Sequence, residues 1–155
     1  MNTSLSPVLQ KDRKVLANML FKYEKEILGK DAPSEYKYLD TYWSRNDSFP
    51  FFIMLDEKRA GFVLINKYTL VTKDAYSVSE FYISKEFRKK DIGKGAAFKT
   101  FDLFPGNWEI REIEENINAQ RFWRKVIDSY TNGKFEEIIL NNDQWHGPVQ
   151  TFNSK

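Results

Sequence analysis

Residues 80–97 read EFYISKEFRKKDIGKGAA, and their pattern is the most informative about the fold. Its first residues belong to an alternating segment, 75–84, in which Glu80, Tyr82 and Ser84 share one side of a predicted strand. A cationic loop with two glycines follows, and the apolar residues after it recur at helical spacing until a Pro-Gly pair ends the run. The pattern predicts a strand, a loop and a helix in that order.

The loop between this strand and this helix is a candidate phosphate site. A helix N-terminus presents unpaired N–H groups and a partial positive charge, and glycines let an anion approach the backbone closely. Within seven positions the chain also places four cationic side chains, which are Arg88, Lys89, Lys90 and Lys94. A solvated cluster of charges at a helix cap is the alternative interpretation.

Two common phosphate loops do not fit this stretch. A dinucleotide-binding loop, G-x-G-x-x-G, needs a glycine where Phe98 stands. A P-loop needs Ser or Thr after Gly-Lys, and the chain has Gly95 there. Both motifs are therefore excluded.

The residues before the stretch predict two helices and a hairpin. A stripe at helical spacing runs through 11–27 and is followed by a glycine; it consists of Val15, Leu16, Met19, Leu20, Tyr23 and Ile27. A shorter helix is predicted over 36–44. The apolar runs 51–55 and 61–66 are separated by a charged turn, which is typical of a β-hairpin.

The residues after the stretch predict three more strands and the clearest helix. That helix covers 116–130, with an apolar stripe made of Ala119, Phe122, Trp123, Val126, Ile127 and Tyr130. The strands are predicted over 108–113, 135–140 and 149–152. The order is roughly β-α-α-β-β-β-α-β-α-β-β, which indicates a mixed sheet of the α/β (α+β) class.

Length and composition exclude several classes of protein. A chain of 155 residues without a linker or repeat predicts one domain, 1–155. The absence of a long apolar stretch or a secretion signal favours a cytoplasmic protein that does not enter a membrane. With no cysteine and a single histidine, His146, predicted in a loop or at a strand edge, the chain predicts no metal site. The 24 basic and 22 acidic residues are too balanced for a nucleic-acid-binding surface.

Two motifs at their expected separation resemble the GCN5-related N-acetyltransferase (GNAT) superfamily. The acyl-CoA loop of that family, R/Q-x-x-G-x-G/A, corresponds here to RKKDIGKG at 88–95. A later helix start, Asn-x-x-Ala-x-x-aromatic-Tyr, corresponds to NINAQRFW at 116–123. The run FPGNWEI at 104–110 is similar to a little-characterised bacterial predicted acetyltransferase group within the superfamily.

The resemblance implies a GNAT-like mixed, mostly antiparallel sheet of about seven strands with about four helices. It also implies acetyl-CoA as cosubstrate and no metal. By the same resemblance, the coenzyme would be bound by residues of the strand, the loop and the later helix start: Tyr82, Ile83, Arg88, Lys89, Lys90, Asp91, Ile92, Gly93, Lys94, Gly95, Ala96, Asn116, Ala119, Phe122 and Trp123. Asn116 alternatively caps its helix, and Phe122 and Trp123 alternatively pack in the core.

Acyl transfer also requires a polarised thioester and a base for the amine. In relatives a backbone N–H of the strand polarises the thioester carbonyl, which here corresponds to Tyr82 and Ile83. Glu80 is the nearest carboxylate on that strand and is the candidate base, acting directly or through water. The alternative for Glu80 is a structural ion pair or a capping carboxylate.

The sequence departs from the family pattern at two places. Asp91 stands where the loop usually has its first glycine; aspartate tolerates left-handed backbone geometry, but its charge repels a diphosphate. Trp123 stands where many relatives have a tyrosine that protonates the departing thiolate, and an indole cannot do so. Tyr130 lies about 10 Å further along the helix, too far for a direct replacement.

These residues leave three candidate functions. The first is an N-acetyltransferase that moves an acetyl group from acetyl-CoA to a primary amine, of a small molecule or of a protein or peptide, in a ternary complex. The second is a non-catalytic acyl-CoA-binding or regulatory module. The third is a nucleic-acid binder, which the balanced charge argues against. Monomer and homodimer are both open, since exposed C-terminal strands pair across dimers in relatives.

Overall fold

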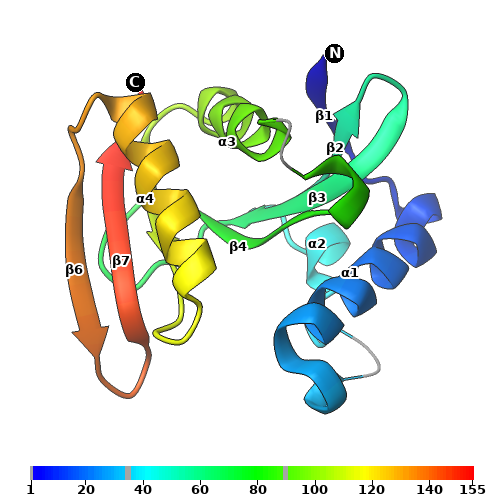
Figure 1. Cartoon of the computed structure of the whole chain (residues 1–155), viewed down its shortest axis with the longest axis horizontal. Coiled ribbons are helices and arrows are strands. Elements are labelled where there is room, and N and C mark those ends of the chain that lie inside the picture. Colours follow the sequence, from blue (N-terminus) through cyan, green and yellow to red (C-terminus); the bar gives the residue numbers. More distant parts are fainter. Residues whose placement is uncertain (1, 34–35, 89–90) are drawn as a thin grey trace. The chain divides into compact units, whose positions relative to one another are not determined.

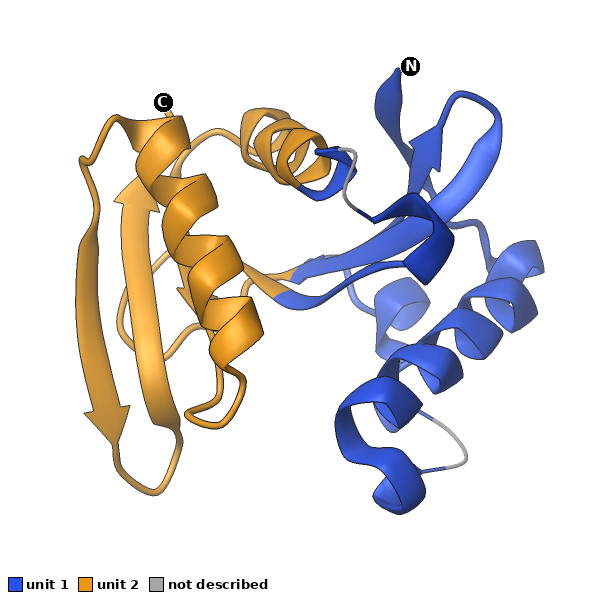
Figure 2. Cartoon of the chain, in the orientation of Figure 1, with its two compact units in different colours: residues 1–65, 79–93 blue, residues 66–78, 94–155 orange. Residues whose placement is uncertain are grey.

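The computed structural model describes residues 2–33, 36–88 and 91–155. The chain forms two compact units: residues 1–65 with 79–93, and residues 66–78 with 94–155 (Figure 2). The strands form a seven-stranded sheet in the order β1-β2-β3-β4-β5-β7-β6. This confirms the predicted fold class and element order. Strand β4 contributes its first half to the second unit and its second half to the first.

The first unit contains strands β1 to β3, the second half of β4 and the N-terminal helices (Figure 1). Their bounds are β1 Thr3–Pro7, α1 Arg13–Leu28, α2 Thr41–Ser44, β2 Ser48–Leu55, β3 Lys58–Asn66 and β4 Ala75–Ile83, with single 3₁₀ turns at Gln10–Asp12, Gly29–Asp31 and Lys85–Phe87. Helix α1 buries Leu16 and Leu20 against Phe62 and Leu64 of β3. The hairpin of β2 and β3 turns at residues 56–57, where Asp56 adopts a φ of 54°.

The second unit contains helix α3 Ile92–Leu103 apart from its first two residues, together with β5 Asn107–Arg111, α4 Ile117–Thr131, β6 Glu136–Asn141 and β7 His146–Asn153. Strand β5 pairs in parallel with β4, from Ala75 opposite Asn107, and antiparallel with β7. Helix α4 lies along β7, and its buried residues include Trp123, Val126 and Ile127 (Figure 1). Its predicted bounds are confirmed to within one residue.

Two predictions about the N-terminal helices are wrong. The helix predicted over 36–44 is reduced to the four residues of α2, because the N–H groups of Leu39 and Thr41 donate to carbonyls three residues back and form turns instead. Ile27 does not join the core: 42% of it is exposed, and Leu28 beside it is 47% exposed. Both side chains therefore lie on the exposed side of the last turn of α1.

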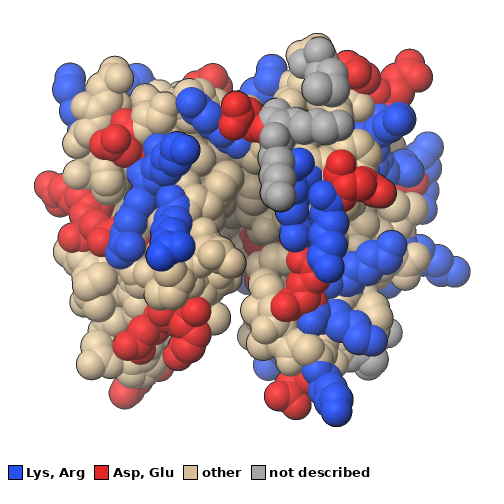
Figure 3. Space-filling view, in the orientation of Figure 1, with Lys and Arg blue, Asp and Glu red and all other residues tan. Residues whose placement is uncertain are grey.

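Charges of both signs are interspersed on the face drawn in Figure 3, over both units. This agrees with the near balance of 24 basic and 22 acidic residues. Among the described residues, no helix is both long and apolar enough to cross a membrane.

Candidate functional site

The second half of β4 directs Glu80 and Tyr82 toward helix α1. Successive side chains of a strand point to opposite faces, so these two residues share a face. Tyr82 belongs to the core cluster that includes Leu16 and Leu20 of α1, and only 6% of it is exposed. Glu80 is partly buried beside the same helix. The strand thus places a carboxyl group among aromatic side chains.

Two phenols donate hydrogen bonds to Glu80. The Oη of Tyr36, in the turns before α2, lies 3.4 Å from Glu80 Oε1, and Tyr23 of α1 is the second donor. Burial raises the pKa of Glu80 to about 7, and the negative charge of Glu24 acts in the same direction, whereas the two phenols oppose it. At neutral pH Glu80 therefore exchanges a proton readily.

Both phenols stay protonated across the physiological range. Burial is the main reason that the pKa of Tyr23 and the pKa of Tyr36 lie far above the usual tyrosine value, and the negative charge of Glu80 raises both further. Glu80 is therefore the one member of this trio that titrates near neutrality.

Arg88 is held by protein groups at the start of the loop. Its Nε donates to the carbonyl oxygen of Ile83 at 2.7 Å, and its Nη2 donates to Glu26 Oε2 at 2.8 Å. Its guanidinium lies 5.5 Å from the ring centre of Tyr82, whose hydroxyl donates to Glu26 Oε1 at 3.3 Å. Arg88 thus ties the end of β4 to α1, a contact that the sequence does not reveal.

Asp91 adopts the left-handed backbone that its place in the loop requires. Its φ is 55°, and the residue is exposed immediately before α3 begins at Ile92. The first turn of α3 contains Gly93 and Gly95, so little side-chain bulk covers its unpaired N–H groups. Lys89 and Lys90, also predicted to bind the coenzyme, lie outside the described residues.

The remaining loop residues divide between the helix core and its surface. Ile92 is 3% exposed and Ala96 is fully buried, so their side chains anchor α3. The ammonium of exposed Lys94 lies 5.6 Å from the ring centre of Phe98. Of these residues, Lys94 is the one whose charge faces solvent.

The start of α4 is capped as one of the two sequence interpretations expects. Asn116 is the N-cap, and its side chain accepts a hydrogen bond from the N–H of Ala119 at 3.1 Å. Trp123 is 6% exposed, and its ring centre lies 5.0 Å from that of Phe122 and 6.3 Å from that of Phe101. Asn116 and Trp123 therefore have structural partners within this unit.

Tyr130 is engaged at the other end of α4. Its hydroxyl donates to Asp102 Oδ1 at 2.6 Å. Burial and the neighbouring charge of Asp102 raise the pKa of Tyr130 to about 12. Its proton is therefore held within this pair.

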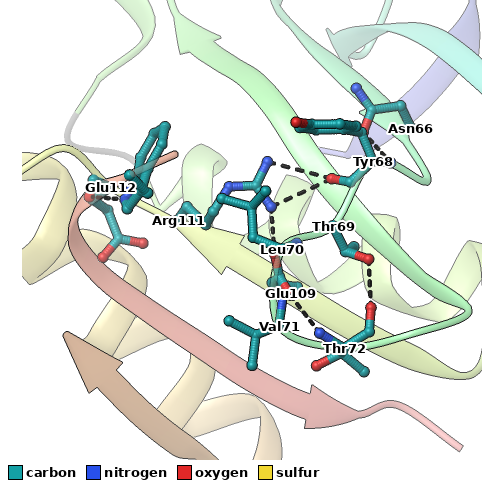
Figure 4. Close-up of polar contacts among 10 residues, drawn as sticks. Asn66, Tyr68, Thr69, Leu70, Val71, Thr72, Glu109, Arg111 and Glu112 are labelled. Carbon is teal, nitrogen blue, oxygen red and sulfur yellow. Dashed lines mark hydrogen bonds and ion pairs between the residues drawn. The ribbon is translucent and has the colours of Figure 1, made fainter. Parts of the chain in front are cut away.

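Glu109 of β5 binds the backbone of the β3–β4 connection (Figure 4). The side chain is fully buried, and its two carboxylate oxygens accept hydrogen bonds from three successive N–H groups, those of Leu70, Val71 and Thr72, at 2.8 to 2.9 Å. Arg111 also pairs with Glu109. These contacts occupy the carboxylate completely and make it a structural group.

Glu112 lies in a second buried polar network of the same unit. Gln150 Nε2 donates to Glu112 Oε1 at 2.8 Å and to Glu137 Oε1 at 2.7 Å, and Arg124 forms an ion pair with Glu137. Within the described residues, Glu112 Oε2 and Gln150 Oε1 have no hydrogen-bond partner. Burial raises the pKa of Glu112 to about 8, with the charge of Glu137 adding to the effect and the Gln150 bond opposing it.

The described residues contain no group of three or more histidine, cysteine, aspartate or glutamate side chains that could hold a metal ion. The single histidine, His146, begins β7, and its Nδ1 lies 2.5 Å from Asn141 Oδ1 across the β6–β7 hairpin. It is thus the first residue of a strand that lies between β5 and β6, and it does not lie in a loop.

Sequence reasoning missed the phenol partners of Glu80 and the Glu26 partner of Arg88. Tyr23 is part of the predicted apolar stripe, and Tyr36 was assigned to a helix, so neither signalled contact with a carboxyl group. The Tyr36–Glu80 contact spans 44 positions, and nothing local in the sequence encodes it. The one available signal was that both are tyrosines, whose hydroxyls need partners when buried.

Comparison with known proteins identifies a family model and similar solved structures. The family model described as Acetyltransferase (GNAT) family matches residues 16–127. The fold is similar to that of an acetyltransferase from Thermus thermophilus, with 14% identity, a TM-score of 0.73, and 99% of this chain and 97% of the other covered.

Two further similar structures are described as complexes with coenzyme A. AAC(6')-Ib in complex with ribostamycin and coenzyme A has 12% identity and a TM-score of 0.75, covering 99% of this chain and 94% of the other. PaiA N-acetyltransferase from Thermoplasma acidophilum in complex with coenzyme A has 12% identity and a TM-score of 0.63, covering 99% of both chains. At these identities the likeness shows the fold.

A curated GTPase Der from Acaryochloris marina is 29% identical over 100 residues. The match covers 63% of this chain, which spans only 21% of the length of that protein.

Proposed function

The chain belongs to the acetyltransferase (GNAT) family, and on that premise we propose that it moves an acetyl group from acetyl-CoA to a primary amine. In the proposed reaction the amine attacks the thioester carbonyl directly in a ternary complex. The nitrogen–carbon bond forms, the carbon–sulfur bond breaks, and the amine loses a proton. The observation that supports this proposal most is the environment of Glu80.

Glu80 is the proposed general base. A base is most effective when its pKa lies near the working pH, and the pKa of this carboxyl is raised to about 7. Its two phenol partners occupy two of the about four lone-pair sites of a carboxylate, so others remain for an amine or a bridging water. General-base catalysis of this kind contributes about a hundredfold to ten-thousandfold in rate.

The proposed coenzyme site is the loop and the first turn of α3. The N–H groups of Gly93 and Gly95 would bind the diphosphate, because a helix N-terminus favours an anion. Lys94 adds an exposed cation, whereas Arg88 is tied to Glu26 and Ile83. The backbone N–H groups near Tyr82 and Ile83 would polarise the thioester carbonyl, a contribution of about 3 kcal/mol for each such donor.

The proposed leaving group is unprotonated coenzyme thiolate. Trp123 has no acidic proton in the useful range, and Tyr130 is bonded to Asp102. A thiol with a pKa of about 8.5 leaves as its anion at moderate cost, so the reaction does not require a tyrosine acid.

The proposed acceptor is a small-molecule amine, with a protein or peptide amine as the other candidate. AAC(6')-Ib, a structural neighbour, is described with the aminoglycoside ribostamycin. In this chain, the carboxyl group of Glu80 lies beside the aromatic rings of Tyr23 and Tyr36, and such surroundings suit a cationic amine. We propose action without a metal or a nucleic acid.

The second candidate function is a non-catalytic acyl-CoA-binding or regulatory module. The buried indole of Trp123 in place of an acid and the exposed carboxyl of Asp91 in the loop are the observations that favour it. Binding of acetyl-CoA without turnover separates it from the enzyme.

The test measures binding and turnover separately. Calorimetry with coenzyme A and acetyl-CoA measures binding, and release of free thiol with a panel of amines and polyamines measures transfer. We expect binding, thiol release with at least one amine, and a loss of about a hundredfold or more in Glu80→Gln. Glu57→Gln, at the exposed turn of the β2–β3 hairpin, is the matched control and should keep full activity. Binding without release would favour the module, and no binding would overturn both functions.

A further inference from the structure

We propose that Tyr23 and Tyr36 are positioning residues for Glu80: their phenol hydroxyls hold its carboxyl group in one orientation and favour the ionised form, which accepts a proton. The catalytic meaning of this role rests on the proposed function. The contacts themselves are independent of it, so the two can fail separately.

The two donors reach Glu80 from different segments of the first unit. Tyr23 lies in the middle of α1, and Tyr36 lies in the turns that precede α2. The Tyr36 hydroxyl is 3.4 Å from Glu80 Oε1, and Tyr23 also donates to the carboxyl group. Donors arriving from two segments restrict rotation of the carboxyl group more than one donor does.

Ring packing fixes the position of each hydroxyl. The ring of Tyr23 meets Phe62 edge-on, with centres 5.6 Å apart, and meets Tyr82 with centres 5.7 Å apart. The ring of Tyr36 packs on Tyr38, with centres 6.3 Å apart. Aromatic side chains held in this way have few rotamers left, so the hydroxyls are preorganised.

The hydrogen bonds act against two effects that favour the neutral acid. Burial and the charge of Glu24, on α1, raise the pKa of Glu80. Among the described residues, Ser79 on β4 and Tyr42 on α2 also act on Tyr36. None of these groups is a cation, so the phenols are the donors that keep the carboxyl group ionisable near neutral pH.

The experiment titrates Glu80 directly. Protein labelled with ¹³C at the side-chain carboxyl of glutamate is titrated by NMR, and the signal of Glu80 is the one that disappears in Glu80→Gln. We expect the midpoint near pH 7 to rise by about one unit in Tyr23→Phe, because one charge-assisted hydrogen bond is lost. Tyr36→Phe should raise it by less, because its hydrogen bond lowers the pKa of Glu80 by less than that of Tyr23 does.

Phenylalanine keeps the ring contacts, so both variants are expected to fold, and the titration itself reports on folded protein. Tyr38→Phe is the matched control, because it removes a hydroxyl from the ring that packs on Tyr36. Tyr38 is 54% exposed, so this substitution should leave the midpoint of the Glu80 titration unchanged. An unchanged midpoint in both Tyr23→Phe and Tyr36→Phe would overturn the inference.

A pH profile of thiol release separates this inference from the proposed function. If Glu80→Gln retains full turnover while the midpoint shifts as expected, Glu80 is not the base and the positioning contacts stand. If Glu80→Gln is inactive but the tyrosine variants keep the wild-type acidic limb, the proposed base stands and the positioning role is wrong.

Discussion

Replacement of Glu112 by glutamine should stabilise the protein, and the gain should grow with pH. Glu112 is 3% exposed, and its Oε2 has no hydrogen-bond partner among the described residues. Its pKa of about 8 means that the folded protein keeps a proton on this carboxyl at neutral pH. The unfolded chain releases that proton near pH 4.5, so folding above this pH must take one up.

The magnitude follows from the two pKa values. A carboxyl group whose pKa is raised on folding contributes its full stability below the unfolded value, and that contribution is lost as the pH rises to the folded value. Each unit is worth about 1.36 kcal/mol, so the cost is about 1 kcal/mol at pH 5, about 3 kcal/mol at pH 7 and close to its maximum above pH 8. Glutamine is neutral throughout and avoids this cost.

The assay is urea unfolding of the wild type and Glu112→Gln at pH 5, 6, 7 and 8. The difference in unfolding free energy between them should rise from about 1 to about 3 kcal/mol between pH 5 and pH 7. Glu114→Gln, which changes an exposed carboxyl two residues away, is the control, and its unfolding free energy should differ from that of the wild type by the same amount at every pH. A flat difference for Glu112→Gln as well would refute the buried-proton reasoning.

Three other predictions concern single positions. Asp91→Gly should lower the dissociation constant for coenzyme A by about fivefold in calorimetry, because a negative charge near the anion site is removed. Asp74→Gly is the control: it relieves a similar left-handed φ, of 50°, elsewhere in the chain and should leave the dissociation constant unchanged. Glu109→Gln should lower the unfolding free energy by about 3 kcal/mol, since an amide cannot accept all of the backbone donors, and a melting temperature equal to that of the wild type would contradict this. Gly61→Ala should cost about 1 to 3 kcal/mol, because a Cβ there would lie 1.8 Å from the carbonyl oxygen of Tyr82; equal urea midpoints would show that β4 moves away freely.

The elements with strong local patterns could be predicted from the sequence. The stripe of α4 and its cap residue, Asn116, gave the helix to within one residue, because a 3.6-residue period and a capping side chain are local properties. The left-handed conformation expected to be tolerated at Asp91 is present for the same reason. The prediction of a helix over 36–44 was wrong because the first residues of the segment form turns with hydrogen bonds three residues back, and only Thr41–Ser44 is helical.

The partners of the candidate site could not be predicted in this way. Glu80 could be recognised as a carboxylate on the strand that precedes the predicted coenzyme loop. The phenols that bind it, however, are separated from it by long stretches of chain. Arg88 illustrates the same limit: four nearby cations suggested an anion site, whereas its guanidinium is bound to Glu26 on α1. Side-chain pairing across a fold depends on packing that a single sequence does not reveal.

The hydrogen bonds between Glu109 and the backbone of the β3–β4 connection have an evolutionary consequence. Its carboxylate recognises three peptide groups and none of the side chains of Leu70, Val71 and Thr72. Mutations in those three codons can therefore accumulate with little penalty as long as the amides remain, whereas the glutamate itself should resist replacement. Among orthologues, we expect the residues at positions 70–72 to vary in sequence while glutamate is retained at position 109.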